Sequence, residues 1–319
     1  RQAWMDEVPR LEAALSSTSC AWMLTDATGV LIGSTCVGRS HEALMPVATR
    51  LGVNLSEDAV GTTAPGVAAR TGKPICVLGG EHFFDSVKEM HCAAAPIRDI
   101  RGQLAGVLDL SSERIPFSFD AAAVAGVFAG AIENRLLVAQ STEHLVVRFQ
   151  IAAELLDTAM VALVGIDADG LIAWENAAAH SLLGGAPLAG PQADRHPDRR
   201  LGWPWPQLAS LPASGAAPLA LPNGLLVWAR AEMRMPDGLR GLVPAWSPPV
   251  VEAPEVAVST TQATAAVPLL RESDLALIQR TLHACKGNVS DAARQLGVSR
   301  GLVYRRLRAA GPRAEARSA

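Results

Sequence analysis

The sequence lacks the short motifs that mark several common kinds of catalytic site. It has no H-E-x-x-H metal motif. The string most similar to a phosphate-binding loop, GVAARTGKP at residues 66–74, departs from that loop twice. Five residues instead of four separate its glycines, and Pro74 stands where the loop needs a hydroxyl for magnesium. We therefore expect neither ATP hydrolysis nor another enzymatic activity.

Long apolar runs and paired cysteines are also absent. The most apolar stretch, residues 121–132, is too short to span a bilayer, and the first residues mix acids and bases, unlike a signal peptide. The five cysteines are scattered without a C-x-x-C pair, which is typical of reduced thiols rather than of a disulfide framework. These features predict a cytoplasmic protein that does not enter a membrane.

Charge is unevenly distributed along the 319 residues. The net charge is −3, but residues 270–319 contain ten Lys or Arg and four Asp or Glu, so this segment carries +6 and the remainder −9. A basic tail on an acidic body indicates a polyanionic partner for the tail alone.

Residues 271–309 have the pattern of a small helical DNA-binding domain. Gly287 and Asn288 end one helix and begin another over 290–296, and Ser299 is a good N-cap for a third. Two short helices joined by a turn that contains glycine form the helix-turn-helix plan. The residues predicted to hold the helices together are Leu275, Ile278, Leu282, Ala293, Val298, Val303 and Leu307.

The opposite face of the third helix is basic. In a major groove, Arg300 would reach base edges while the later arginines reach phosphates, and Gly301 would let the backbone approach the duplex. An amphipathic terminal helix with a merely solvated basic face is the alternative. The predicted DNA-binding residues are Ser299, Arg300, Gly301, Tyr304, Arg305, Arg306 and Arg308.

The string GNVSDAARQLGVSRGLVYRRLRAAG (287–311) resembles the Fis-type helix-turn-helix at the end of bacterial enhancer-binding activators. Its Ser299-Arg300 and Tyr304-Arg305 pairs match the recognition helix of that family. The resemblance implies double-stranded DNA as a partner and a homodimer, with the helix over 271–285 in the dimer interface. A sensor or scaffold that dimerises through these helices without binding DNA is the alternative.

Residues 54–112 predict a helix over 59–70 that ends at Gly72, a buried strand KPICVLG (73–79), and a hairpin around DIRG. With EDAVGTTAPG, EHF and CAAAPIRD, this stretch is similar to the GAF domain of the acetoin-catabolism activator group. The resemblance implies a sensor for a small-molecule effector, such as an acetoin-like ketone, an alcohol, an aldehyde or an aromatic compound.

A polar insert over 81–92 interrupts this pattern and is the candidate effector loop. Its carboxylates, Cys92 and two histidines are all metal-ligand types, but their spacing fits no standard zinc site, so we predict no metal. A small-molecule pocket is the favoured interpretation. The predicted effector-binding residues are Glu57, Thr62, Glu81, His82, Phe83, His91 and Cys92.

Two similar segments indicate a second sensor. LTDATGVLIG (24–33) and GIDADGLIAW (165–174) each contain a strand, an Asp-Ala-x-Gly turn and a strand. Residues 154–184 resemble the start of a PAS domain, with Asn176 in its motif, and a hairpin follows about residues 222–224. No residue indicates haem or flavin, so no cofactor is predicted.

The segment between the sensors, residues 116–149, predicts one long helix or two in tandem. Such a helix would either pair across a dimer or pack on its own sheet.

These patterns predict α+β sensor domains, GAF and then PAS-like, joined by a linker to a small all-α Fis-type helix-turn-helix domain. Activators of this group carry a central ATPase, whose G-A-F-T-G-A loop is absent here. We expect a sequence-specific, effector-responsive transcriptional regulator without ATPase activity, acting alone or with a full-length activator. The predicted segments are 1–140 (GAF with flanking helices), 141–242 (PAS-like), 243–268 (Pro/Ala-rich linker), 269–312 (helix-turn-helix) and 313–319 (tail).

Overall fold

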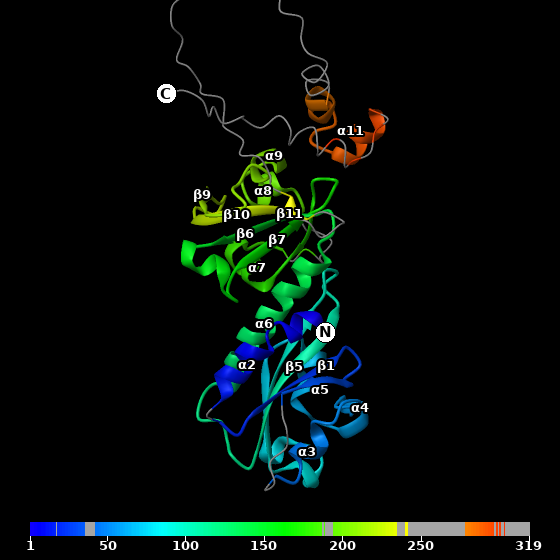
Figure 1. The fold of residues 1–319 in the computed structure, drawn as a ribbon, viewed down its shortest axis with the longest axis vertical. Coiled ribbons are helices and arrows are strands. Elements are labelled where there is room, and N and C mark those ends of the chain that lie inside the picture. The colour runs from blue at the N-terminus through cyan, green and yellow to red at the C-terminus, as the bar shows by residue number, and fades with distance from the viewer. Residues whose placement is uncertain are drawn as a thin grey trace, which may run out of the picture. The chain divides into compact units, whose positions relative to one another are not determined.

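Two compact units make up the protein, shown here as a computed structural model (Figure 1). Unit 1 comprises Arg1–Ser141 and Asp157–Val161, and unit 2 comprises Thr142–Leu156 and Ala162–Ala319. Each unit contains an antiparallel sheet and helices, so the fold is α+β as expected. The structure describes residues 1–16, 18–35, 42–186, 188, 194–234, 240–241, 278–296, 298, 300 and 303.

Unit 1 is built on a five-stranded antiparallel sheet with the strand order β2-β1-β5-β4-β3. Helices α2 and α6 cover one face, and α5 covers the other (Figure 1). The elements in chain order are α1 (Gln2–Met5), α2 (Val8–Leu15), β1 (Ala21–Asp26), β2 (Leu31–Ser34), α3 (Met45–Ala48), α4 (Glu57–Val60), α5 (Ala64–Thr71), β3 (Ile75–Leu78), β4 (Met90–Arg98), β5 (Leu104–Glu113) and α6 (Ala121–Gln140).

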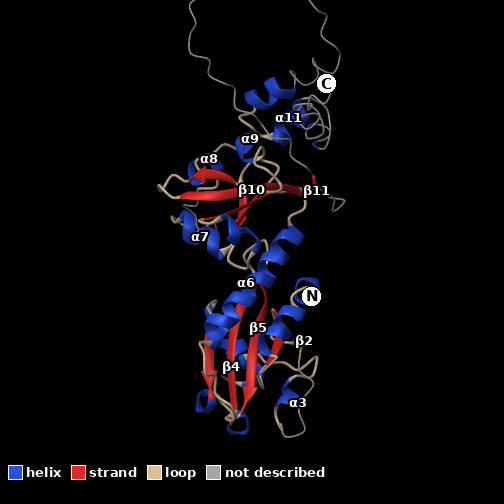
Figure 2. Ribbon diagram, turned by 60° about the vertical axis from the view of Figure 1, so that its left-hand side comes forward, coloured by secondary structure: helices blue, strands red, loops and turns tan. Residues whose placement is uncertain are grey.

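Strands β4 and β5 form the hairpin predicted around DIRG and are the longest strands of unit 1 (Figure 2). Their side chains alternate between the two faces of the sheet. Leu108 and Leu110 lie in the core under α2 and α6, whereas Val107 lies in the core under α5. Asp109 and Ser111 therefore lie on the α5 side, and both are fully buried.

Helix α6 packs its alanine-rich side on the sheet. Ala121, Ala125, Ala129 and Ile132 recur at helical spacing and are buried in the core that also contains Trp22. Its length and composition would also suit a membrane span, a property shared by core helices of soluble proteins. The contacts of α6 with β4 and β5 show that it is a core helix of unit 1.

The helix predicted over residues 116–149 ends early. Helix α6 stops at Gln140, and the chain turns into strand β6 (Leu145–Gln150), the middle strand of the second sheet. Glu143 in the connection has a φ of 61°, a left-handed conformation that a continuing helix excludes. The expectation of one long helix is therefore correct only for its first part.

The helix predicted over 59–70 is divided into two. Gly61 has a φ of 66° and ends α4, and Thr63 then caps α5 by accepting a hydrogen bond from the backbone N–H of Gly66 at 3.1 Å. The predicted end of the helix is confirmed, because Gly72 adopts the left-handed conformation with a φ of 69°.

Strand β3 lies at the edge of the sheet, contrary to the expectation of a buried strand over 73–79. Of its four residues only Val77 is buried, and Leu78 is exposed. An apolar run does not distinguish an edge strand from a central one, since both bury one face.

Unit 2 has a second antiparallel sheet with the order β11-β10-β6-β7-β8, in which β9 also pairs with β10. The predicted hairpin about residues 222–224 is confirmed, and Gly224 has a φ of 90°. The further elements are β7 (Ala162–Ile166), β8 (Ile172–Glu175), α7 (Ala177–Leu183), α8 (Pro197–Arg200), α9 (Trp205–Leu208), β9 (Ala217–Ala220), β10 (Leu226–Arg234) and β11 (Arg240–Gly241).

The C-terminal segment has a helix over residues 278–284 and helix α11 (Val289–Gln295). The predicted junction is confirmed. Gly287 has a φ of 87°, and the Asn288 side chain accepts a hydrogen bond from the backbone N–H of Asp291 at 3.0 Å. The buried residues here are Ile278, Leu282, Val289, Ala292, Ala293 and Val303.

The two Asp-Ala-x-Gly segments form the predicted hairpins, β1–β2 and β7–β8. Asp26 Oδ1 accepts hydrogen bonds from the backbone N–H groups of residues 28 and 30 at 2.8 and 3.0 Å. Asp167 Oδ1 accepts from residues 169 and 171 at 2.9 and 3.0 Å. Gly29 and Gly170 have φ values of 88° and 78°, which side-chain-bearing residues rarely adopt.

Substitution of these two glycines by alanine should destabilise the protein unequally. In both variants, the left-handed backbone conformation should lower the free energy of unfolding by roughly 1–2 kcal/mol. Gly29→Ala should cost more, because the added Cβ would lie 2.8 Å from Ser56, whereas the nearest atom at Gly170 is 3.8 Å away. Urea unfolding of both variants measures the difference, and equal losses would contradict this account of the first turn.

Candidate functional site

The predicted effector-binding residues have different environments. Glu57 forms an ion pair of 2.7 Å with Arg70, and Glu81 accepts a hydrogen bond of 2.7 Å from the backbone N–H of Leu78. Thr62 is partly buried between α4 and α5. Both glutamates thus have partners within the protein. These contacts suit a role in stabilising the local structure as well as a role in binding.

The loop between β3 and β4 buries His82 and exposes its neighbour. His82 is 4% exposed, and its Nδ1 lies 3.0 Å from the Gly79 carbonyl oxygen. Burial lowers the pKa of His82, and the Gly79 carbonyl only partly opposes this effect. Phe83 is 67% exposed and packs edge-on against Phe84 with ring centroids 5.0 Å apart.

The polar insert predicted over 81–92 is shorter than expected. Met90 already begins strand β4, so His91 and Cys92 are strand residues rather than loop residues. Their side chains consequently point to opposite faces of the sheet. Among the residues that the structure describes, no three His, Cys, Asp or Glu side chains are grouped to hold a metal ion.

A buried polar cluster lies on the α5 face of the unit 1 sheet. Ser111 Oγ donates a hydrogen bond of 2.6 Å to Asp109 Oδ2 and lies 3.1 Å from Cys92 Sγ. Asp109 Oδ1 and the hydroxyl of Thr25 are also buried, but neither has a hydrogen-bond partner. Cys92 is thus the one predicted effector residue that belongs to this cluster.

Burial controls the protonation of the cluster. It raises the pKa of Asp109 to about 7, although the hydrogen bond from Ser111 opposes the rise. It also raises the pKa of the Cys92 thiol well above its ordinary value, and the nearby Asp109 adds to this effect. Near neutral pH the cluster therefore contains a protonated thiol and a carboxyl group close to its titration midpoint.

Sequence reasoning did not single out Asp109, Ser111 or Thr25. The signal was a carboxylate and a serine two residues apart inside an otherwise apolar strand, LAGVLDLSS. Alternation along a strand puts both on one face. Their approach to Thr25 depends on the pairing of β5 with β1, which lies far away in the sequence.

Glu113, at the end of the same strand, is buried, and both of its carboxylate oxygens have hydrogen-bond partners. Its carboxylate accepts hydrogen bonds from the backbone N–H groups of Ala43, Leu44 and Met45 at 2.9, 2.9 and 3.0 Å. These bonds attach the start of α3 to the sheet on the Asp109 side, where Met45 joins the core. This carboxylate is structural.

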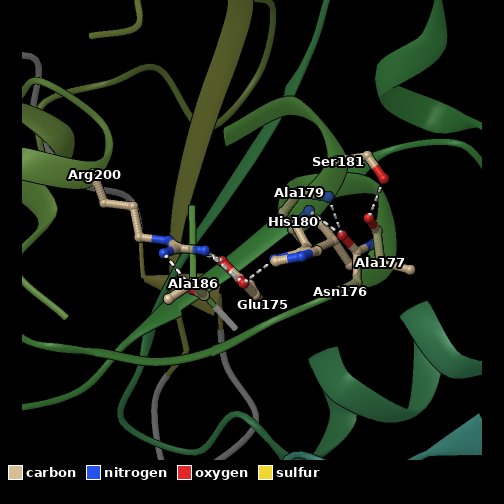
Figure 3. A network of polar contacts seen from close by, with 9 residues as sticks. Glu175, Asn176, Ala177, Ala179, His180, Ser181, Ala186 and Arg200 are labelled. Carbon is tan, nitrogen blue, oxygen red and sulfur yellow. Dashed lines mark hydrogen bonds and ion pairs between the residues drawn. The ribbon is translucent and has the colours of Figure 1, made fainter. Parts of the chain in front are cut away.

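Unit 2 contains a second buried polar network, around Glu175 (Figure 3). Arg200 donates hydrogen bonds to both carboxylate oxygens at 2.7 and 2.8 Å, and both side chains are almost fully buried. His180 approaches Glu175 from the other side, with its Nδ1 3.0 Å from Oε1. Asn176 Oδ1 accepts from the backbone N–H groups of residues 163 and 179. These groups have internal partners and tie β8, α7 and α8 together.

The described part of the predicted DNA-binding face is small. Arg300 is exposed and Val303 is fully buried, in agreement with the predicted outer and inner faces of the last helix. The letters of residues 297–301 also read G-x-S-x-G, a hydrolase motif, but helix α11 precedes them instead of the strand that motif requires. Outside the described residues lie Leu275, Leu307, Ser299, Gly301, Tyr304, Arg305, Arg306 and Arg308.

Comparison with known protein families matches two segments of the chain. Residues 3–128 match the family described as MimR, N-terminal domain, and residues 269–309 match the family described as Bacterial regulatory protein, Fis family. The C-terminal segment thus matches a family of regulatory proteins, and the N-terminal segment matches a domain named after MimR. The resemblances to acetoin-type regulators and to the Fis-type helix-turn-helix are thus confirmed.

Curated relatives carry regulatory names. The acetoin catabolism regulatory protein of Cupriavidus necator is 32% identical over 175 residues, which is 52% of this chain and 26% of the relative. The propane 2-monooxygenase operon transcriptional activator MimR of Mycolicibacterium smegmatis is 30% identical over 132 residues, or 40% of this chain and 22% of the relative. The chain thus spans about a quarter of the length of these relatives.

Among solved structures, the Escherichia coli DhaR(N)–DhaL complex is similar at 15% identity and a TM-score of 0.40. The similarity covers 72% of this chain and 84% of that chain.

The stability of unit 1 should depend on the proton of Asp109. Its pKa of about 7 in the folded protein lies above the ordinary 3.8, so the native state holds this proton more tightly than the unfolded chain. The stabilisation is complete below about pH 4 and is lost towards about pH 7, at up to roughly 1.4 kcal/mol per pH unit. Asp109→Asn removes the titration.

The difference in unfolding free energy between wild type and Asp109→Asn should therefore decrease from about pH 4 to about pH 7 and then level off. Urea unfolding at a series of pH values measures it. A difference that is constant with pH would show that Asp109 titrates normally.

Removal of Arg200 should strongly destabilise unit 2. Arg200→Ala leaves the Glu175 carboxylate buried without its cation, which typically costs about 3–5 kcal/mol. His180→Ala is the matched control, because the His180 side chain is 41% exposed and its loss should cost less than about 1 kcal/mol. Similar losses in the two variants, measured by urea unfolding, would refute the central role of Arg200.

Proposed function

We propose that this protein is a sequence-specific DNA-binding transcriptional regulator whose N-terminal unit responds to a small-molecule effector. The observation that carries the proposal is the Fis-family match over residues 269–309. The described residues agree with it, since α11 begins at the cap Asn288, Val303 is buried and Arg300 is exposed. The basic charge of this segment, +6 over 270–319, suits a DNA partner.

We assign three kinds of DNA contact to the last helix. Arg300 reads a base edge, since arginine binds guanine with two parallel hydrogen bonds. The backbone at Gly301 approaches the duplex, and Ser299 and Tyr304 make shape and backbone contacts. Arg305, Arg306 and Arg308 bind phosphates.

The effector sensor is proposed to be a GAF domain in unit 1, followed by a PAS-like domain in unit 2. The match of residues 3–128 to the N-terminal domain of MimR supports a regulatory role for unit 1. The relatives are named for acetoin catabolism and for a propane 2-monooxygenase operon. A small ketone, alcohol, aldehyde or aromatic compound is therefore the proposed effector class.

The protein is proposed to act as a homodimer without ATPase activity, because Fis-type segments read paired half-sites and the sequence contains no phosphate-binding loop. Regulation then works by recruitment, by repression or together with a full-length activator. Measurable ATP hydrolysis by the pure protein would contradict this part of the proposal.

Arginine substitutions should separate base reading from phosphate binding. Arg300→Ala should cost about 1–3 kcal/mol at its own base pair and relax specificity there, whereas Arg306→Ala should weaken binding to all sequences alike. Arg306→Ala should also reduce the slope of log K against log salt by about one. Fluorescence anisotropy with the upstream DNA and a scrambled duplex, at several salt concentrations, measures both effects.

Arg101→Ala is the matched control. It removes the same charge from the exposed turn between β4 and β5, so DNA affinity should stay close to wild type. Equal loss of specificity from the Arg300 and Arg306 variants would overturn the division of roles. DNA binding without steep salt dependence, or none at low salt, would favour a sensor that only dimerises through its C-terminal helices.

A further inference from the structure

The loop between β3 and β4 presents a pair of aromatic rings to solvent. Phe83 and Phe84 are 67% and 46% exposed, and their rings pack edge-on with centroids 5.0 Å apart. Leu78, where the loop begins, is a further exposed apolar side chain. Phe83 and Phe84 form what we call the aromatic patch. Large apolar side chains that gather at one exposed point are typical of interaction surfaces.

Contacts on both sides of Phe83 hold the loop that carries the aromatic patch. His82 is buried, with its Nδ1 3.0 Å from the Gly79 carbonyl oxygen. Gly61 lies so close to the Phe83 side chain that an added Cβ would be 2.5 Å from Phe83 Cβ. The rings are therefore presented by a preformed loop, which lowers the entropy cost of binding a partner.

The exposure of Phe83 suits a protein-binding surface better than a ligand pocket. A small-molecule pocket encloses most of its ligand, and the side chains that line it face inward. Phe83 instead turns about two thirds of its surface to solvent. The loop that the sequence suggested for an effector thus exposes its aromatic side chains in the way that protein interfaces use them.

The neighbouring sheet edge is protected against the addition of another strand. Pro74 directly precedes β3 and has no N–H to donate. The backbone N–H of Leu78, the last residue of β3, already donates to Glu81 at 2.7 Å. A partner at this place therefore meets the side chains of the loop rather than the backbone of β3.

The loop and the helix beside it have an acidic balance. Lys88 pairs with Asp85 at 2.5 Å, so these two loop charges cancel. Glu81 in the loop and Asp58 on α4, the helix that ends at Gly61, add two exposed negative charges. Such a surface disfavours DNA and anionic lipid, and it favours a protein with Lys or Arg beside an apolar pocket.

We propose that the aromatic patch is the surface with which this regulator recruits RNA polymerase. This inference rests on the proposed regulatory function and selects recruitment among its modes. A regulator without an ATPase acts through other proteins on the DNA, and such proteins present basic surfaces because they bind DNA. Phe83 and Phe84 enter an apolar pocket of the polymerase, and Asp58 and Glu81 face its Lys or Arg side chains.

The size of the aromatic patch argues against a second copy of the chain as its occupant. A stable interface buries at least about 1,200 Å² in total. One aromatic side chain buries about 150–250 Å², so the four rings of two patches supply less than about 1,000 Å². Asp58 and Glu81 would also lie near their own copies, where like charges repel. A short-lived contact with a large partner needs less area.

The test is binding of the full chain to RNA polymerase holoenzyme, purified from the bacterium that encodes the protein, by biolayer interferometry without DNA. The double variant Phe83→Ser with Phe84→Ser should bind the polymerase about tenfold more weakly or worse, because truncation removes two hot-spot side chains. Its affinity for the upstream DNA and its melting temperature should stay close to those of wild type, since both side chains are exposed.

Phe119→Ser is the matched control. Phe119 is 38% exposed and packs on Phe117 with ring centroids 5.7 Å apart, but it precedes α6 and lies outside the loop. Polymerase binding should not change in this variant. Asp58→Asn should weaken binding severalfold at low salt and little at high salt, because salt screens exposed charges. This variant decides the matter if the double variant does not fold.

Several outcomes would overturn the proposal. Equal polymerase binding by wild type and the double variant would exclude the aromatic patch. A dimer that the double variant dissociates, measured by analytical ultracentrifugation, would show that a second copy covers it. Absence of polymerase binding by a wild type that still binds its upstream DNA would sink the recruitment surface and leave the regulator standing. Polymerase binding without any DNA binding would instead contradict the proposed DNA-binding function.

Discussion

The two-residue alternation of strand β5 determines what each face of the unit 1 sheet can contain. Leu108 and Leu110 fill the core under α6, while Asp109 and Ser111 face α5. A slip of one residue would move the carboxyl group into the α6 core and the leucines out of it. The bonds from Glu113 to the start of α3 hold the register at the far end of the strand. The alternation of side chains along β5 thus determines both the apolar packing under α6 and the position of the buried polar groups under α5.

Features that are decided within a few residues could be read from the sequence. The turn of each Asp-Ala-x-Gly segment is closed by its own aspartate and glycine, so both hairpins were predictable without knowing their partners. The same holds for the junction at Gly287 and Asn288, where a left-handed glycine and a capping amide adjoin.

Predictions failed where distant pairing decides the structure. Residues 145–150 continue an apolar stretch without proline or glycine, and only pairing with β7 and β10 makes them a strand. An apolar run of this length does not separate helix from strand. The requirement for glycine at position 61 likewise depends on a distant residue, because a Cβ there would lie 2.5 Å from Phe83 in another loop.

The same limit applies to the buried polar cluster of unit 1. The predicted effector-binding residues lie between residues 57 and 92, and the structure gives Glu57 and Glu81 partners of their own. The open polar groups come instead from β1 and β5, more than eighty residues apart in the chain. Asp109 was visible as a polar residue in an apolar strand, but its lack of a partner became visible only with the opposing strands in place.

The buried polar networks of the two units differ in what they leave unpaired. In unit 2 the Glu175 network is closed, because each charged group already has a partner of opposite charge or a hydrogen bond. A ligand would have to break those contacts and replace them, which gives little net gain. In the buried cluster of unit 1, Asp109 Oδ1 and the Thr25 hydroxyl have no hydrogen-bond partner, so no existing contact holds them. The buried cluster of unit 1 thus leaves hydrogen-bonding groups open, whereas the Glu175 network does not.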